Sequence, residues 1–327
     1  MRAIVCRSLG GPEVLEERSL PEPTPGPHDL LLEVLAAGLN PVDLKTRESG
    51  LGFERAFPFV LGYDVCGVVR GRGEAVEGFE EGDRVVASPS LVRDGANAEF
   101  VCVDARGAAR VADHVDPVEL AALPLVVIAA WEALFDRCRL REGEVLAVLG
   151  GAGGVGHVAI QLARERGARV VTTAGTDASI ALCAELGAEE VVDHRDPTST
   201  RRLLDACGGG ADVVLDTVGG DVFEQALDVV GVDGRIATLL PGESPRLAET
   251  LFVRNASLHY EFMGIPGVTG RRPESHGRIL REACGLLLAD RLRPVIHATF
   301  PLGELGAAHR EQETGHVHGK VVIRVGA

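Results

Sequence analysis

Residues 145–175 contain a strand, a glycine-rich turn, a helix and a second strand, and this order constrains the fold more than any other feature. Val145–Leu149 is apolar, three glycines follow in a Gly-x-Gly-x-x-Gly pattern, and a helical pattern continues to Arg166. A second apolar run begins at Arg169. A strand, a helix and a second strand in this order are typical of a βαβ unit. We therefore expect a parallel sheet.

The three glycines have different expected roles. Gly151 would permit the tight turn, Gly153 would let the backbone approach a pyrophosphate, and Gly156 would let the helix and strand pack closely. The start of the helix also presents free N–H groups and the positive end of its dipole to phosphate. The pattern, set within a full strand–helix–strand unit, predicts a dinucleotide site.

The end of the second strand bears on which dinucleotide binds. Sites for NAD place an acidic residue there, where it accepts a hydrogen bond from the ribose 2′-hydroxyl. Here the sequence reads Thr173-Ala174-Gly175-Thr176, which is small and neutral, and we expect Asp177 to be the N-cap of the next helix. The segment favours NADPH and leaves NADH possible.

The rest of the chain falls into two parts that differ in their pattern of strand-like and helical segments. Short strand-like segments separated by Gly and Pro fill residues 1–122 and predict a barrel or sandwich. Strands alternate with helical patterns from about residue 126 and predict helices on both faces of a parallel sheet. We expect the last strand-like segments to return to the first domain. We therefore expect an α/β plus β fold with domains at 1–122 plus 268–327 and at 123–267.

Composition excludes several classes. The 33 basic and 48 acidic residues give a net charge of −15, which argues against nucleic acid or an anionic membrane surface as a partner. No apolar run approaches the roughly 20 residues that span a bilayer. The seven cysteines form no CxxC pair, so we expect reduced, buried thiols in a cytoplasmic protein.

The sequence resembles the medium-chain dehydrogenase/reductase superfamily, and within it the zinc-independent quinone oxidoreductase branch. The resemblance covers essentially the whole chain in collinear order. It implies a Rossmann domain, a GroES-like β-barrel catalytic domain, and a homodimer formed through the strand Ser257–Phe262. The segments that carry it are AAGLNPVDLKTR (36–47), PFVLGYDVCGVV (58–69), GDRV (82–85), AALPLVVIAAWEAL (121–134), GGAGGVGHVAIQLA (150–163), LDTVGG (215–220) and GHVHGKVV (315–322).

The positions that hold zinc in the alcohol dehydrogenase branch differ here. The first cysteine position falls near Asn40, and the Gly-His-Glu motif reads Gly62-Tyr63-Asp64. His316 and His318 have no third ligand to complete a zinc site. We therefore expect no metal, and without a Lewis acid the acceptor must already be electrophilic, as a quinone or an α,β-unsaturated carbonyl is.

The resemblance implies three candidate catalytic residues. Asn40 lies beside the nicotinamide and substrate in the family. Tyr63 replaces the metal-binding histidine, and its phenol either donates a proton to the acceptor or packs at the cleft wall. Lys45 stands where several quinone oxidoreductases have tyrosine, and it either orients a carbonyl or is solvated.

The resemblance also implies the cofactor contacts. Ser179 replaces a lysine that many NADPH-specific members pair with the 2′-phosphate, and Arg195 is a possible substitute for it. The implied cofactor-binding residues are Asn40, Gly151, Gly153, Gly154, Val155, Gly156, Gly175, Thr176, Ser179, His194, Val218, Phe262, Met263 and Lys320.

We expect an NADPH-dependent, zinc-independent reductase of small quinones or enones. One alternative is an enoyl-thioester or 2-alkenal reductase on the same scaffold. Another is a non-catalytic NADPH-binding protein of the crystallin or regulatory kind, which would bind NADPH without acceptor-dependent oxidation.

Overall fold

The computed structural model describes residues 1–326 and divides into two compact units. Unit 1 contains Met1–Leu125, Gly264–Ala289 and the stretch from Arg293 onward. Unit 2 contains Val126–Met263 and the short return Asp290–Leu292. The two main boundaries between the units follow Leu125 and Met263. The sequence placed the domain boundaries near residues 122 and 267.

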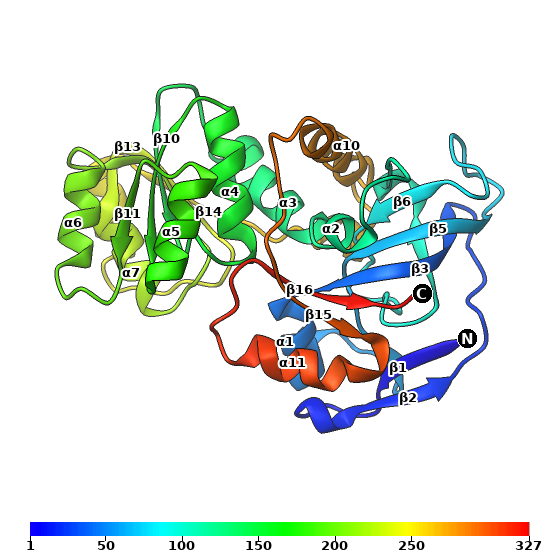
Figure 1. Cartoon of the computed structure of the whole chain (residues 1–327). Helices are drawn as coiled ribbons and strands as arrows, with labels where there is room; N and C mark the ends of the chain where they lie inside the picture. Colours follow the sequence, from blue (N-terminus) through cyan, green and yellow to red (C-terminus); the bar gives the residue numbers. More distant parts are fainter. Residues whose placement is uncertain (327) are drawn as a thin grey trace. The chain divides into compact units, whose positions relative to one another are not determined.

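Unit 2 is built on a six-stranded sheet in which every pairing is parallel (Figure 1). The strand order is β11-β10-β9-β12-β13-β14, the doubly wound order of dinucleotide-binding folds. The predicted parallel sheet is therefore confirmed. The strands are β9 (Val145–Leu149), β10 (Arg169–Ala174), β11 (Glu190–Asp193), β12 (Ala211–Asp216), β13 (Val230–Thr238) and β14 (Ser257–Tyr260).

Two groups of helices pack against this sheet. The first two crossover helices contact each other, and the next three form a second contacting series. The buried core on that second side joins β-strand residues to Leu203 and Phe223. The helices are α4 (Gly154–Glu165), α5 (Asp177–Leu186), α6 (Ser199–Ala206), α7 (Asp221–Val229) and α8 (Leu247–Arg254), preceded by α3 (Pro124–Trp131) and the π-helical η4 (Glu132–Arg137).

Unit 1 contains two sheets, and its described strands do not close into the barrel that we expected. The larger has the order β15-β16-β3-β5-β6-β8, with β7 also paired to β3, and the smaller is β2-β1-β4. The C-terminal strand β16 pairs with β3, so the end of the chain does return to the first domain (Figure 1). The strands are β1 (Arg2–Cys6), β2 (Leu15–Ser19), β3 (Asp29–Leu39), β4 (Phe59–Val60), β5 (Val65–Arg72), β6 (Arg84–Ala87), β7 (Phe100–Asp104), β8 (Ala109–Arg110), β15 (Ile296–Pro301) and β16 (Lys320–Arg324).

The helices of unit 1 include one that the apolar pattern did not reveal. Helix α1 (Pro41–Ser49) buries Asp43, Thr46 and Arg47 beside Leu44, so its inner face is mostly polar. The remaining helical segments are η1 (Pro12–Val14), η2 (Gly50–Gly52), η3 (Ala105–Gly107), α2 (Pro117–Ala121), α9 (Ile265–Thr269), α10 (Glu274–Leu288), η5 (Leu302–Glu304) and α11 (Leu305–Glu313).

Arg47 connects α1 to α11. Its fully buried guanidinium lies 3.0 Å from His309 Nδ1 and donates to Glu313 Oε1 at 2.7 Å and to the Gly10 carbonyl at 2.9 Å. Burial and the nearby arginine lower the pKa of His309 to about 3, so its ring stays neutral. A fixed charge therefore holds three separate segments together.

All seven cysteines are buried and unpaired, as expected. Within residues 1–326, no helix combines the length and the apolar character needed to cross a bilayer.

A carboxyl pair in unit 2 determines a pH response. Glu132 on η4 hydrogen-bonds Glu261, which follows β14 and accepts from Arg137 Nε at 2.8 Å. Burial, reinforced by Glu261, raises the pKa of Glu132 to about 8. The folded protein thus retains a proton that the unfolded chain releases above about pH 4.5. This contribution to stability falls as pH rises from about 4.5 to about 8.

We predict that Glu132→Gln removes part of this fall, because the glutamine amide can donate to Glu261 as the protonated acid does. At pH 8.5 the variant should exceed the wild type in free energy of unfolding by at least about 1 kcal/mol. At pH 5 the two should be nearly equal. Urea unfolding at both pH values measures this, with the exposed Glu282→Gln as control. Equal pH dependence in all three proteins would contradict the prediction.

Candidate functional site

The glycine turn after β9 has a geometry that revises one expected role. The residue with positive φ is Gly150, at +88°, so Gly150 rather than Gly151 makes the tight turn. Gly151 is needed for another reason, because a Cβ there would collide with Thr172 Oγ1 and lie 3.1 Å from Cys183 Sγ.

The other two glycines differ in the space around them. A Cβ at Gly156 would collide with the backbone of Gly150 and Gly151. A Cβ at Gly153 would meet only the Gly150 carbonyl oxygen, at 3.3 Å. Gly153 is the N-cap of α4, whose first N–H groups have no acceptor within the helix. The turn is thus packed on its inner side and open to a ligand beyond Gly153.

The loop after β12 lies against the same turn. A Cβ on Gly150 would come within 2.8 Å of Thr217 Oγ1 and Val218 Cγ2. Asp216, which had no predicted role, holds this loop by accepting from the N–H groups of Val218 and Gly219. Strands β9 and β12 are neighbours at the point where the strand order reverses, which is where open α/β sheets bind ligands.

Four of the predicted cofactor-binding residues lie together at the end of β10: Gly175, Thr176, Ser179 and His194. The ring of His194 lies so close to Gly175 that a Cβ there would collide with it. Thr176 is the N-cap of α5, and its Oγ1 accepts from the N–H of Ser179. Our expectation that Asp177 caps this helix was therefore wrong, because Asp177 is its first helical residue.

The two possible partners for a 2′-phosphate are already engaged. Ser179 is buried, and its hydroxyl accepts from the N–H of Thr176 at 2.9 Å and donates to the Thr176 carbonyl. Arg195 donates to Asp193 Oδ2 at 2.8 Å. His194 and Thr176 remain exposed to solvent. The neutral surface that we expected at this strand end is therefore made mainly by these two residues.

Unit 1 contains a buried network around Asn40. Its Nδ2 donates to Asp64 Oδ2 at 2.8 Å, and its Oδ1 accepts from Lys320 Nζ. Lys320 also contacts Asp64 Oδ2 at 3.0 Å. The Leu125 N–H donates to Asp64 Oδ1 at 2.6 Å. Asn40 thus uses both ends of its amide inside unit 1.

Two carboxylates of this network were not among the predicted site residues. Asp43 accepts from the N–H groups of Asn40 and Gly62, each at 2.9 Å. Burial raises the pKa of Asp43 to about 7, and burial also raises the pKa of Asp64, against the opposing effect of Lys320. The sequence did contain a sign of this network. Asp64 is an acidic residue within the apolar run FVLGYDVCGVV, and a carboxylate buried in such a run requires a partner.

The other two candidate catalytic residues lie in contrasting surroundings. Tyr63 is fully buried in an apolar cluster, and its hydroxyl accepts from Arg55 Nη1 at 3.3 Å. Burial raises its pKa to about 12. This geometry favours the packing alternative for Tyr63. Lys45 is exposed on α1.

The predicted residues therefore form separate groups. Asn40 and Lys320 meet in unit 1, and the glycine turn meets Val218 in unit 2, while Gly175, Thr176, Ser179 and His194 gather at the end of β10. Phe262 is 43% exposed and Met263 is half-buried just after β14. Their roles toward a ligand stay predictions.

The residues at the family's zinc position do not suit a dication. Asn40 and Asp64 are bound to each other and to Lys320, whose ammonium would repel a metal ion beside Asp64. Tyr63 is held by Arg55. Among the described side chains, no group of three or more His, Cys, Asp or Glu residues is arranged to hold a metal ion.

Comparison with known proteins agrees with this architecture. Residues 26–113 match the family described as alcohol dehydrogenase GroES-like domain, and residues 186–323 match the family described as zinc-binding dehydrogenase. A quinone oxidoreductase of Rattus norvegicus is 29% identical over 95% of this chain and 93% of its own length. An NADPH-dependent alkenal/one oxidoreductase of Arabidopsis thaliana is 31% identical over 99% of this chain and 79% of its own.

A solved structure supports the same grouping. The quinone oxidoreductase from Coxiella burnetii has a TM-score of 0.87 and 32% identity, covering 99% of both chains. The fold and the glycine turn define a two-unit oxidoreductase with a Rossmann sheet. The chain belongs to the medium-chain dehydrogenase/reductase superfamily, with the quinone oxidoreductases among its relatives.

The buried network leads to a prediction on stability. We expect Asp64→Asn to lower the free energy of unfolding by about 3–5 kcal/mol, because it leaves the Lys320 ammonium buried without a counter-charge. Lys320→Met should have an effect of similar size. The double variant should lose less than the sum of the two, since neither charge remains.

Urea unfolding of the four proteins completes this double-mutant cycle. The control is Asp205→Asn, which breaks the exposed pair with Arg201 and should change stability by less than about 1 kcal/mol. Additive losses in the double variant would show that the Asp64–Lys320 contact contributes nothing to folding.

Proposed function

We propose that this chain is an NADPH-dependent reductase of quinones or α,β-unsaturated carbonyl compounds and that it works without zinc. The observation that carries the proposal is the turn after β9, where Gly151 and Gly156 have no space for a side chain and Gly153 is open on its outer side. Support also comes from the relatives, including a mycobacterial structure complexed with NADPH that is 29% identical with a TM-score of 0.87.

The residues of unit 2 would hold the cofactor. The first N–H groups of α4, beyond Gly153, suit the pyrophosphate. The exposed His194, with the neutral Thr176 beside it, suits the 2′-phosphate. Bound NADPH would supply the hydride. The electrophilic acceptor requires no Lewis acid, which agrees with the donor set around Asp64.

Unit 1 would supply the side chains that act on the acceptor. Asn40 is fixed by Asp64 and Lys320 and therefore serves as a positioning residue for the start of α1. Tyr63 supports the adjoining loop through Arg55. Lys45 is the solvent-exposed member of the three, and we propose that it orients the acceptor oxygen. A cytoplasmic location stays a prediction from the cysteine usage.

We predict that Thr176→Asp weakens the preference for NADPH over NADH. An aspartate also caps helices, so α5 should persist, while its charge repels a 2′-phosphate. The value of kcat/KM for NADPH should fall at least about tenfold, equivalent to about 1.4 kcal/mol, with a smaller change for NADH. Thr176→Asn, which caps without the charge, is the control.

The assay is steady-state oxidation of NADPH and NADH by chelator-treated protein with a small quinone and with an enone. Faster oxidation of NADPH by the wild type supports the proposal. Preference for NADH would favour Asp177 as the determinant. Tight NADPH binding without oxidation by either acceptor would favour the non-catalytic alternative, and zinc-dependent activity would contradict the zinc-free proposal.

We also propose that two copies associate through the outer edge of unit 2. Strand β14 ends the sheet, so its outer backbone groups are available for pairing. Large apolar side chains nearby are exposed, including Phe252 at 86% and Val253 at 67% on α8 and Tyr260 at 53% on β14. Contact with a second copy would remove these surfaces from water.

Light scattering after size-exclusion chromatography tests this association. We expect the wild type to have twice the chain mass of 34.4 kDa. Val253→Asp should shift it toward the monomer, because a charge would be buried at the contact. Val92→Asp, at an apolar residue 39% exposed in unit 1, should leave the mass unchanged. A monomeric wild type would contradict the proposal.

A further inference from the structure

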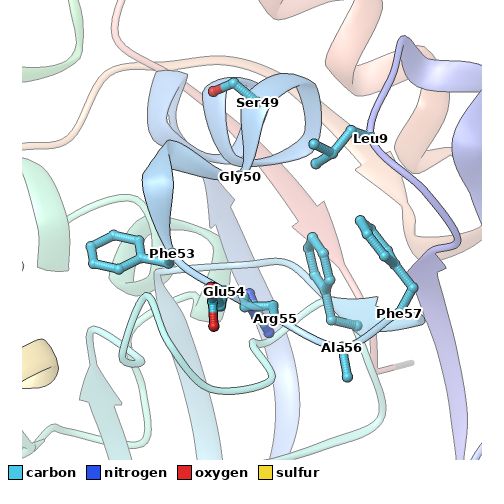
Figure 2. Close-up of a pocket in the computed structure, with 9 residues that line it drawn as sticks. Leu9, Ser49, Gly50, Phe53, Glu54, Arg55, Ala56 and Phe57 are labelled. Carbon is cyan, nitrogen blue, oxygen red and sulfur yellow. The ribbon is translucent and has the colours of Figure 1, made fainter.

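A cavity of unit 1 lies where α1 ends and the loop to β4 begins (Figure 2). Its volume of about 430 Å³ falls within the range of small-molecule sites. Leu9, Gly50, Phe53, Phe57 and Phe59 give it mainly apolar walls. The proposed reductase function assigns no role to these walls.

Two of the walls are exposed although they are apolar. Leu9 is 44% exposed and Phe57 is 45% exposed, and Figure 2 shows them on the same side of the cavity. The Phe57 and Phe59 rings lie 5.2 Å apart at an interplanar angle of 31°. A ligand that covers these side chains would remove their apolar surface from water.

The back of the cavity is fixed by Arg55. Its guanidinium carbon lies 4.1 Å from the centroid of the Phe59 ring, and Nη2 donates to the Arg93 carbonyl at 2.9 Å and to Asp94 Oδ1 at 3.2 Å. With its side chain 7% exposed, Arg55 stabilises the wall and has little surface to offer a ligand. The Phe59 ring is therefore supported from behind before any ligand arrives.

The lining indicates the chemistry of the occupant. The Ser49 hydroxyl is already used, since it donates to the Lys45 carbonyl at 2.9 Å. The exposed carboxylate of Glu54 and the net charge of −15 disfavour an anion. Aromatic walls favour a flat ring that can stack or meet them edge-on. We propose that this cavity binds a neutral aromatic molecule of one or two rings.

This site is separate from the network around Asn40. Asn40 precedes the first residue of α1, and the cavity begins at Ser49 and Gly50 at the other end of the helix. The nine residues of α1 span about 13 Å. Binding here therefore requires neither NADPH nor hydride transfer, and its test is independent of the proposed reductase activity.

The test is a fluorescence titration of the full chain, without nucleotide, using 6-propionyl-2-(dimethylamino)naphthalene. This neutral two-ring probe responds to an apolar environment. We expect saturable binding to the wild type and a Kd at least about tenfold higher for Leu9→Ser and for Phe57→Ser. Leu288→Ser, at a leucine 51% exposed on α10, is the matched control and should keep the wild-type Kd.

A further variant separates loss of the site from loss of the fold. Leu9→Trp keeps an apolar side chain but adds bulk at the cavity, so it should also weaken binding while thermal unfolding stays near that of the wild type. Absence of saturable binding to the wild type would overturn the proposal. So would equal Kd values for Leu9→Ser, Phe57→Ser and Leu288→Ser.

Discussion

The contact between Lys320 and Asp64 is the interaction on which unit 1 depends most. Both side chains are almost completely buried, so each charge would be costly without the other. The pair joins β16 at the end of the chain to the loop before β5, and Asn40 connects it to the start of α1. This burial of opposite charges therefore holds the start of α1. The other end of α1, beside the cavity lined by Leu9 and Gly50, is held by Arg47.

Unit 2 depends on steric exclusion. Side chains at Gly151 and Gly156 would collide with Thr172 and with the turn itself, so the backbone passes close to β10 and then enters α4. The loop held by Asp216 adjoins the same turn. One unit therefore owes its local geometry to paired charges, and the other to the absence of side chains. Substitutions in unit 1 and in unit 2 should therefore destabilise the protein for different physical reasons, loss of a charge partner in unit 1 and steric collision in unit 2.

Sequence patterns predicted the parts of the fold that repeat a local rule. The alternation of strands and helices predicted the parallel sheet, and the spacing of glycines predicted the turn after β9. Helix α1 was not predicted because its buried face carries the polar residues Asp43, Thr46 and Arg47. Asp43 and Arg47 have partners in distant segments, Gly62 and Glu313. Closure of a barrel is likewise not a local property, so strands that are individually recognisable do not reveal that they form two sheets.

The candidate site shows the same division. The capping of α5 was locally encoded, since Thr176 and Ser179 have the spacing of a capping box, although Asp177 offered a competing cap. Ser179 and Arg195 are likewise engaged by near neighbours in sequence, Thr176 and Asp193. The contacts of Asn40 with Asp64 and Lys320 join distant segments, so spacing could not specify them.

The contacts of Asn40 point to a different role from the one that its place in the sequence suggests. Its place in the family motif suggests contact with substrate, but both ends of its amide are satisfied by Asp64 and Lys320. Turning the amide toward a ligand would leave a buried ammonium and a buried carboxylate with fewer partners, which costs more than one hydrogen bond returns. We therefore propose that Asn40 acts on the reaction through the position of α1, and that direct contact with the acceptor is made by side chains outside this network.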